Sequence, residues 1–147
     1  MNVIWDFTLD NPTYSIISFP SAKLPDQYKG LVFSCWLKTL RYGNIMFKMI
    51  DSRSYYENYH RYIENILKQS KSAIKLAVLT DDFDVALGFC AHRDNILDYV
   101  YVAKDFRKQN IGSKLVPKEI DRLTHLTRAG EKFATKCYVR WTFDPFA

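Results

Sequence analysis

The chain has 147 residues, of which 48% are hydrophobic and 16% aromatic, and its formal net charge at pH 7 is +5. This apolar content excludes an intrinsically disordered chain, and the length suits a single domain over 1–147 with one core. The excess of 21 basic over 16 acidic residues is too small to identify a nucleic-acid-binding protein, which stays a minor alternative.

The cysteines, the histidines and the N-terminal sequence are those expected of a cytoplasmic protein. The three cysteines are widely separated, lie in apolar runs and form no metal-binding pair, so we expect reduced, buried thiols. No histidine has a ligand-like neighbour, so no metal is expected. The first residues show neither a signal peptide nor a membrane span, so we expect no association with a membrane.

The first half of the chain predicts a strand followed by two helices. Residues 13–19 are rich in β-branched and aromatic side chains, which favours a strand. A helix is expected over 25–43, because apolar residues recur there at helical spacing. The capping box S-x-x-E at 54–57 begins a second helix that ends near Lys68. Residues 45–50, between the helices, fit a short strand, a helical turn or a lid.

The second half predicts three strands, a helix and a last strand. Links of three and four residues join the three strands, which implies an antiparallel meander. These strands are 73–80, 85–92 and 96–102. A helical stripe follows over 110–127, interrupted by Pro117, and alternation over 134–143 predicts the last strand. The predicted order is therefore β-α-α-β-β-β-α-β, an α/β (α+β) fold.

The segment 96–115 joins a strand to a helix through a basic turn. The first amides of such a helix have no intrahelical partner and the helix dipole favours an anion, so the turn suits a phosphate. Asn110 tolerates a left-handed backbone, and Gly112 lacks a β-carbon where a ligand must approach closely. The cations around the turn are Lys104, Arg107, Lys108 and Lys114. Taken alone, the pattern also fits a basic loop that only caps a helix.

Residues 107–112 of this turn read RKQNIG and follow the strand sequence LDYVYV. The turn resembles the (Arg/Gln)-x-x-Gly-x-(Gly/Ala) motif of the GNAT N-acetyltransferases, with Asn110 in the place of the first glycine. Gly88 matches the glycine that family members carry in the preceding strand. The resemblance implies a GNAT-like mixed, mostly antiparallel sheet of about five strands, flanked by about three helices.

The resemblance also implies roles for individual residues. Acetyl-CoA would be the co-substrate, with two strand residues pairing with its pantetheine arm and the turn holding its pyrophosphate. The implied cofactor-binding residues are Val100, Val102, Arg107, Lys108, Gln109, Asn110, Ile111, Gly112 and Ser113. Acyl transfer to an amine needs a base and an acid. Asp98 or His92 is the nearest candidate base and Tyr138 the candidate acid, although no motif specifies them.

The end of the chain departs from the family pattern. Family members continue past the fifth main strand into another helix and two strands, whereas this chain ends at Ala147, soon after the strand expected at 134–143. The resemblance therefore predicts a C-terminally truncated member of the family, and a phage-encoded protein is one origin that would fit.

Two functions remain open from the sequence. The first is an acetyl-CoA-dependent N-acyltransferase acting on a primary amine, carried by a small molecule or a protein, with acceptor specificity in loops such as 41–53. The second is a catalytically silent GNAT-fold protein that binds a partner, forms a homo-oligomer or belongs to an assembly such as a phage particle.

Overall fold

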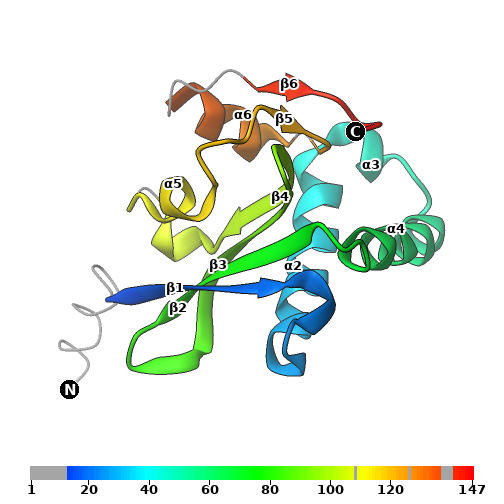
Figure 1. The fold of residues 1–147 in the computed structure, drawn as a ribbon. Coiled ribbons are helices and arrows are strands. Elements are labelled where there is room, and N and C mark those ends of the chain that lie inside the picture. The colour runs from blue at the N-terminus through cyan, green and yellow to red at the C-terminus, as the bar shows by residue number, and fades with distance from the viewer. Residues whose placement is uncertain (1–12, 108, 126, 137–140) are drawn as a thin grey trace.

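The computed structural model describes residues 13–107, 109–125, 127–136 and 141–147, whose strands form one open sheet (Figure 1). The sheet order follows the chain: β1 (Tyr14–Pro20), β2 (Ser72–Leu79), β3 (Asp82–Arg93), β4 (Ile96–Val102), β5 (Arg122–Leu123) and β6 (Thr142–Phe143). Strands β1 to β4 are antiparallel neighbours, whereas β5 pairs in parallel with both β4 and β6. The expected mixed, mostly antiparallel sheet is confirmed, with six strands.

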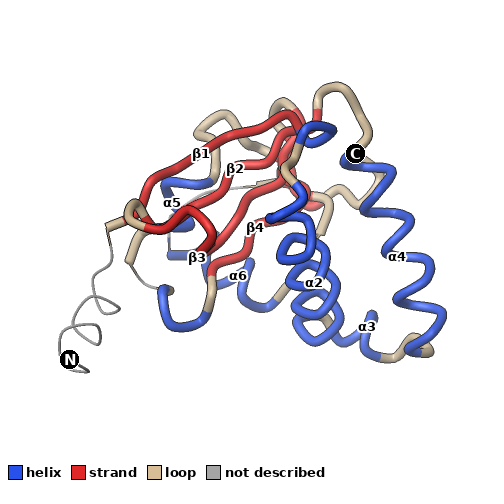
Figure 2. Tube along the Cα trace, turned by 90° about the horizontal axis from the view of Figure 1, so that it is seen from below, coloured by secondary structure: helices blue, strands red, loops and turns tan. Residues whose placement is uncertain are grey.

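Helices lie on both faces of the sheet. The long helices α2 (Asp26–Gly43) and α4 (Ser52–Leu67) pack on one face, whereas the short α5 (Ile111–Leu115) packs on the other (Figure 2). The single turn α3 (Ile45–Lys48) joins α2 to α4, and α6 (Arg128–Lys136) lies between β5 and β6 in the chain. Two 3-10 turns, η1 (Ser21–Lys23) and η2 (Lys104–Phe106), follow β1 and β4.

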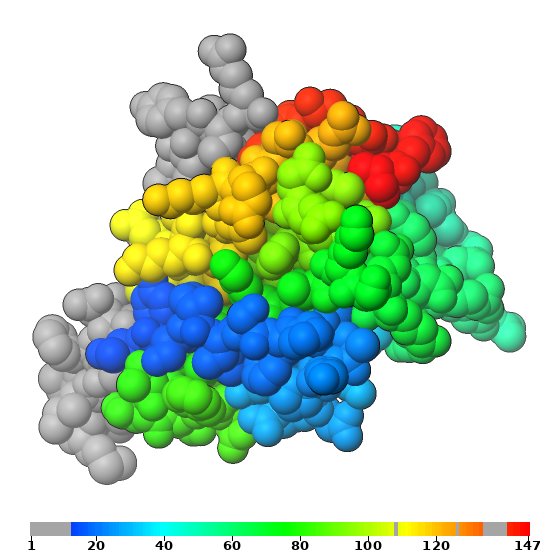
Figure 3. Space-filling view, viewed as in Figure 1, coloured from blue at the N-terminus to red at the C-terminus, as the bar shows by residue number. Residues whose placement is uncertain are grey.

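The two faces of the sheet bury separate apolar clusters. The larger cluster joins α2 and α4 to the sheet through fully buried side chains such as Trp36, Ile63 and Phe89. The smaller cluster joins α5 to the opposite face through Ile111 and Leu87. Figure 3 shows the α5 region (yellow) and the segment after it (orange) packed against β3 and β4 (green). Each such side chain stabilises the fold by roughly 1.5–3 kcal/mol through burial.

Polar side chains explain where two of the helices begin. Asp51 accepts a hydrogen bond from the Ser54 amide at 3.1 Å, so Asp51 caps α4, three residues before the capping box that the sequence suggested. Asn44 accepts a hydrogen bond from the Met46 amide at 2.9 Å and caps α3. Of the three alternatives for 45–50, the structure therefore shows the helical turn.

Strand β4 contains an extra residue at Asp98. Ala91 of β3 faces Tyr99 and His92 faces Leu97, so Asp98 has no partner of its own across the ladder. Such a bulge changes the face on which the following side chains lie, and it bends the strand. Leu97 accordingly packs with the α5 cluster, whereas Tyr99 packs with the α2 cluster. The bulge lies next to the point where β4 and β5 cease to pair.

The helix expected over 110–127 is much shorter in the structure. Helix α5 ends at Leu115, because Val116 is extended and Pro117 has no amide with which to continue the helical hydrogen bonds. The chain that follows forms β5, which is the fifth strand of the sheet. The sequence pattern was wrong here because the apolar residues after Pro117 keep a helix-like spacing without being helical.

The last strand was expected over 134–143, and the predicted start of this strand is wrong. Helix α6 runs to Lys136, and the described strand is β6 at Thr142–Phe143, while 137–140 lie outside the described residues. A helix and a strand therefore follow the fifth strand.

Within the described ranges, no helix is both long and apolar enough to cross a membrane, and no group of His, Cys, Asp and Glu could hold a metal ion. Cys90 is a buried free thiol and Cys35 a half-buried one, while Cys137 lies outside the described residues. Burial raises the pKa of Cys90 far above its ordinary value, so this thiol stays protonated.

Candidate functional site

A cavity of about 340 Å³ opens where β4 and β5 separate. The two strands pair only at Ile96 and Leu97, and the later residues of β4, from Tyr99 to Val102, line the cavity. The other walls come from the turn before α5, from the start of α5 and from α6. The cavity therefore lies between the free edge of β4 and the elements that follow it in the chain.

The free edge of β4 presents the backbone of Val100 and Val102 to this cavity. The Ala103 amide donates to the Leu87 carbonyl of β3 at 2.8 Å. Backbone groups of successive strand residues point to opposite edges, which directs those of Val100 and Val102 away from β3. The hydrogen bond that the Val102 carbonyl accepts from Arg107 Nε at 2.9 Å is consistent with this direction, because Arg107 is not part of β3.

The turn between β4 and α5 has the conformation expected from its sequence. Asn110 lies in the left-handed region, with φ 65° and ψ 15°, and is the N-cap residue of α5. The amide of Lys114 bonds to the Asn110 carbonyl at 3.2 Å, so the amides of Ile111 and Gly112 precede the first hydrogen bond of α5 and have no acceptor within it. Asn110, Ile111, Gly112 and Ser113 all line the cavity.

Gly112 faces a side chain of the protein where the sequence suggested a ligand. A β-carbon at Gly112 would lie 2.9 Å from Cε1 of Phe133, so the ring of Phe133 occupies the space that the glycine leaves. Phe133 also lies beside Trp141, with ring centroids 5.9 Å apart. In the structure, the missing β-carbon of Gly112 lets α6 pack across the start of α5.

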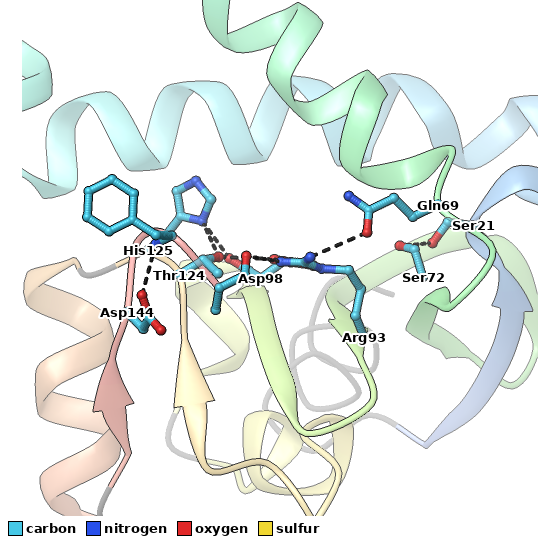
Figure 4. Close-up of polar contacts among 10 residues, drawn as sticks. Ser21, Gln69, Ser72, Arg93, Asp98, Thr124, His125 and Asp144 are labelled. Carbon is cyan, nitrogen blue, oxygen red and sulfur yellow. Dashed lines mark hydrogen bonds and ion pairs between the residues drawn. The ribbon is translucent and has the colours of Figure 1, made fainter.

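Asp98, a candidate base, is part of a buried polar cluster. Its side chain is 0% exposed and accepts hydrogen bonds from Arg93 at 2.7 and 2.8 Å and from Thr124 Oγ1 at 3.0 Å (Figure 4). Both of its carboxylate oxygens therefore already accept hydrogen bonds from neighbouring side chains. Asp98 is also not among the residues that line the cavity. Its contacts join β4 to the segment after β5.

His125 belongs to the same cluster and lies among aromatic rings. Its Nδ1 is 2.9 Å from the Asp98 carbonyl oxygen and 2.9 Å from Thr124 Oγ1. The rings of Trp36 and Tyr62 meet the imidazole edge-on, with centroids 5.6 and 5.7 Å away. Burial lowers the pKa of His125 to about 4, so the ring is neutral at pH 7. Because a carbonyl only accepts, we assign the proton to Nδ1.

The other predicted site residues are placed apart from the cavity or outside the described chain. His92 lies on β3, and neither of its buried ring nitrogens has a hydrogen-bond partner among the residues described. Burial lowers the pKa of His92 below its ordinary value. Neither His92 nor Gln109 lines the cavity. Tyr138 and Lys108 lie outside the described residues.

Sequence reasoning missed two hydroxyl groups on the cavity wall. Tyr99 Oη and Thr39 Oγ1 are 2.6 Å apart, and both residues line the cavity. Burial raises the pKa of Tyr99 to about 12, although the hydrogen bond to Thr39 partly opposes the shift, so the phenol keeps its proton. Tyr99 could have been found from the sequence, because it lies in the strand LDYVYV directly before the motif. Thr39 lies on α2, far from the motif in the sequence, and no sequence pattern indicated it.

No family model and no curated protein matches the chain. A solved structure described as "Putative acetyl transferase from Pyrococcus furiosus" aligns with a TM-score of 0.53 and 16% identity, over 89% of this chain and 81% of that one. The chain has the fold of the GNAT acetyltransferases. A probable acetyltransferase aligns at TM-score 0.48 and 20% identity, covering 88% of this chain and 78% of that one. The complex of AAC(6')-Iy with the bisubstrate analog CoA-S-monomethyl-acetylneamine aligns with a TM-score of 0.43 and 14% identity. This alignment covers 89% of this chain and 78% of that one.

In this GNAT fold, most of the residues that the motif singled out lie around one cavity. Val100 and Val102 form its strand wall, and Arg107 with residues 110–113 forms its turn wall. The two described candidates for catalysis, Asp98 and His92, are not part of it. The cavity therefore has the free backbone edge of β4 on one side and the turn before α5 at one end.

Proposed function

We propose that the protein binds acetyl-CoA, or a related acyl-CoA, in the cavity beside β4 and transfers the acyl group to a primary amine. The observation that carries this proposal is the free backbone edge of β4 set against the turn before α5. An apolar slot with a few fixed polar groups suits a long, flexible pantetheine arm. Amides without intrahelical partners suit a diphosphate. The GNAT fold of the chain supports the same assignment.

Each part of the cavity would hold a different part of the cofactor. Val100 and Val102 would pair with the amides of the pantetheine arm through their outward-facing backbone groups. The turn from 108 to 113 would hold the diphosphate, and Arg107 and Lys132, which line the cavity, would add positive charge. Arg107 now bonds the Val102 carbonyl, so binding of the arm would free its guanidinium for a phosphate.

The residues of the cavity wall limit how the chemistry can proceed. When bound, the cofactor supplies the acyl group as a thioester. Thr39 Oγ1 donates to the Cys35 carbonyl, so the proton of Tyr99, which the phenol keeps at neutral pH, is donated to Thr39 in this structure. To act as an acid, Tyr99 would have to turn this proton from Thr39 toward the bound thioester. Tyr138 stays a second proposed acid. No carboxylate or histidine belongs to the described lining, so the amine would bind neutral or lose its proton to water.

An assay of thiol release tests this function. Acetyl-CoA would be incubated with the protein and a panel of amines comprising peptides with free N-termini, lysine and polyamines. We predict turnover with at least one class, and a roughly 100-fold lower kcat for Tyr99→Phe with unchanged affinity for acetyl-CoA. Tyr56→Phe, on α4 and away from the cavity, is the matched control. A Tyr99→Phe enzyme with the wild-type kcat would remove Tyr99 from the mechanism.

A second candidate is a GNAT-fold binding protein without catalysis. The observation that favours it is the absence of a base among the described residues of the cavity wall. Such a protein would act through a partner, as a homo-oligomer or as part of an assembly such as a phage particle. Acetyl-CoA binding without turnover on any amine would select this candidate. A single domain and a cytoplasmic location remain part of both proposals.

A further inference from the structure

Helix α3 and the end of α2 carry a group of exposed apolar side chains. Ile45, Met46 and Met49 are 71%, 73% and 81% exposed, and Tyr42 and Ile50 on either side are also exposed. We call these five residues the α3 patch. Single exposed apolar residues are common, but a contiguous group marks a surface that contacts another molecule. In Figure 2, α3 lies at the outer end of the helical layer, far from the sheet.

The protein holds this patch outward with a buried arginine. Arg41 donates to the carbonyl of Phe47 at 3.3 Å and to that of Ile50 at 2.9 Å, which ties the C-terminal part of α3 and the residues just after it to α2. Its guanidinium lies over the ring of Tyr55, 5.1 Å from the centroid. Phe47 points inward and packs against Tyr55 and Tyr59. The remaining apolar side chains of the turn therefore face solvent in a fixed arrangement, which lowers the entropic cost of binding.

The α3 patch adjoins the cavity described above. A β-carbon at Gly43, between Tyr42 and α3, would lie 3.1 Å from Cβ of Thr127. Thr127 lines the cavity, as does Thr39 one turn earlier on α2. The end of α2 that carries Tyr42 therefore lies beside a residue of the cavity wall.

The charges around the patch indicate what it binds. Lys48 lies 5.9 Å from the centroid of the Tyr42 ring, and Lys38 is exposed one turn before Tyr42 on the same side of α2. Neither lysine takes part in an ion pair with the acidic residues that the structure describes. A second copy of the chain, docked through the same patch, would bring these cations against their own counterparts. An outward-pointing patch on a single helical turn also cannot enclose a small molecule.

We infer that the α3 patch is a docking surface for a polypeptide segment in which apolar side chains alternate with carboxylates. The apolar side chains of this polypeptide would cover Ile45, Met46 and Met49, and its carboxylates would pair with Lys38 and Lys48. Because the patch adjoins the cavity, this polypeptide also carries the amine that is acylated. That last step rests on the proposed transferase function, whereas the docking itself does not.

Fluorescence anisotropy with two peptides tests the docking. The probe is a fluorescein-labelled decapeptide that alternates Leu and Phe with Asp and Glu, and its twin has Lys at every acidic position. We expect the acidic peptide to bind at least about tenfold more tightly, equivalent to about 1.4 kcal/mol. Met46→Ser with Met49→Ser should weaken binding at least about fivefold, and Lys48→Glu should remove the preference for the acidic peptide.

The matched control changes apolar residues at a distant exposed site. Phe83→Ser with Val85→Ser removes exposed apolar side chains from β3 and should leave peptide binding unchanged. Three results would contradict the docking proposal: the two peptides bind equally well, the control variant loses as much affinity as the Met46 and Met49 variant, or neither peptide binds the wild type. A wild-type dimer that the Met46 and Met49 changes dissociate would assign the patch to a second copy instead. Calorimetry with acetyl-CoA separates the two proposals, because the patch variants should bind it like the wild type.

Discussion

Gly88 shows at the scale of a single residue how closely β3 and β4 approach beside the cavity. A β-carbon there would clash with the Tyr101 carbonyl oxygen, a backbone atom that cannot move without shifting β4. Gly88→Ala should therefore lower the free energy of unfolding by about 2 kcal/mol in urea titrations. Gly30, exposed on α2 with open space around it, is the control, and Gly30→Ala should raise stability by about 0.5–1 kcal/mol. Effects of the same sign would contradict the predicted clash.

His125 should make stability depend on pH. Its pKa is about 4 in the folded protein and near 6.5 when unfolded, so between these values the unfolded chain binds a proton that the folded chain does not. Stability should therefore fall as the pH falls, by about 2 kcal/mol between pH 7 and pH 5. The lowered pKa of His92 acts in the same direction. Urea unfolding at both pH values measures the loss.

The variant His125→Gln isolates this contribution. The loss of unfolding free energy between pH 7 and pH 5 should be smaller by about 2 kcal/mol in the variant than in the wild type, whatever the stability of the variant at pH 7. His60→Gln, on the exposed side of α4, serves as the control for the exchange of a histidine for glutamine. If His125→Gln keeps the full decline, the imidazole is not buried in its neutral form.

At the scale of elements, the sequence predicted those that form from local pattern alone. Strands β1 to β4 and helices α2 and α4 carry clear periodicity and short links, and the structure confirms them. Strand β5 is two residues long and is defined by its pairing with β4 and β6, which no local sequence pattern records. Helix α6 was missed because alternation over 134–143 suggested a strand. The bulge at Asp98 had one signal, a carboxylate within an apolar strand.

The packing of α6 on α5 gives a prediction at this scale. Gly112→Ala should destabilise the protein by about 1 kcal/mol, because its β-carbon meets the ring of Phe133. In a Phe133→Ala background the same change should become stabilising by up to about 1 kcal/mol, since alanine favours helix over glycine. A double-mutant cycle from urea unfolding gives the interaction energy. Additive effects would show that α6 does not cover the start of α5.

For the whole molecule, the sequence predicted the local conformation beside the cavity better than the contacts that distant segments make around it. The turn before α5 and the free edge of β4 follow from a contiguous stretch of chain, so the motif could indicate both. The ion pair of Asp98 with Arg93, the hydroxyl of Thr39 and the ring of Phe133 depend on contacts between distant segments. The ionisable residues closest to the motif in the sequence, Asp98 and His92, therefore do not line the cavity.

Calorimetric titration with acetyl-CoA tests most directly whether the cavity beside β4 holds a diphosphate. The wild type should bind with a dissociation constant below about 1 mM. Ser113→Glu places a carboxylate on the turn wall, where it favours the helix start but repels phosphate, and should weaken binding at least about tenfold. The neutral Ser113→Gln should bind within about threefold of the wild type. No heat of binding at millimolar acetyl-CoA, or wild-type affinity in Ser113→Glu, would contradict the account.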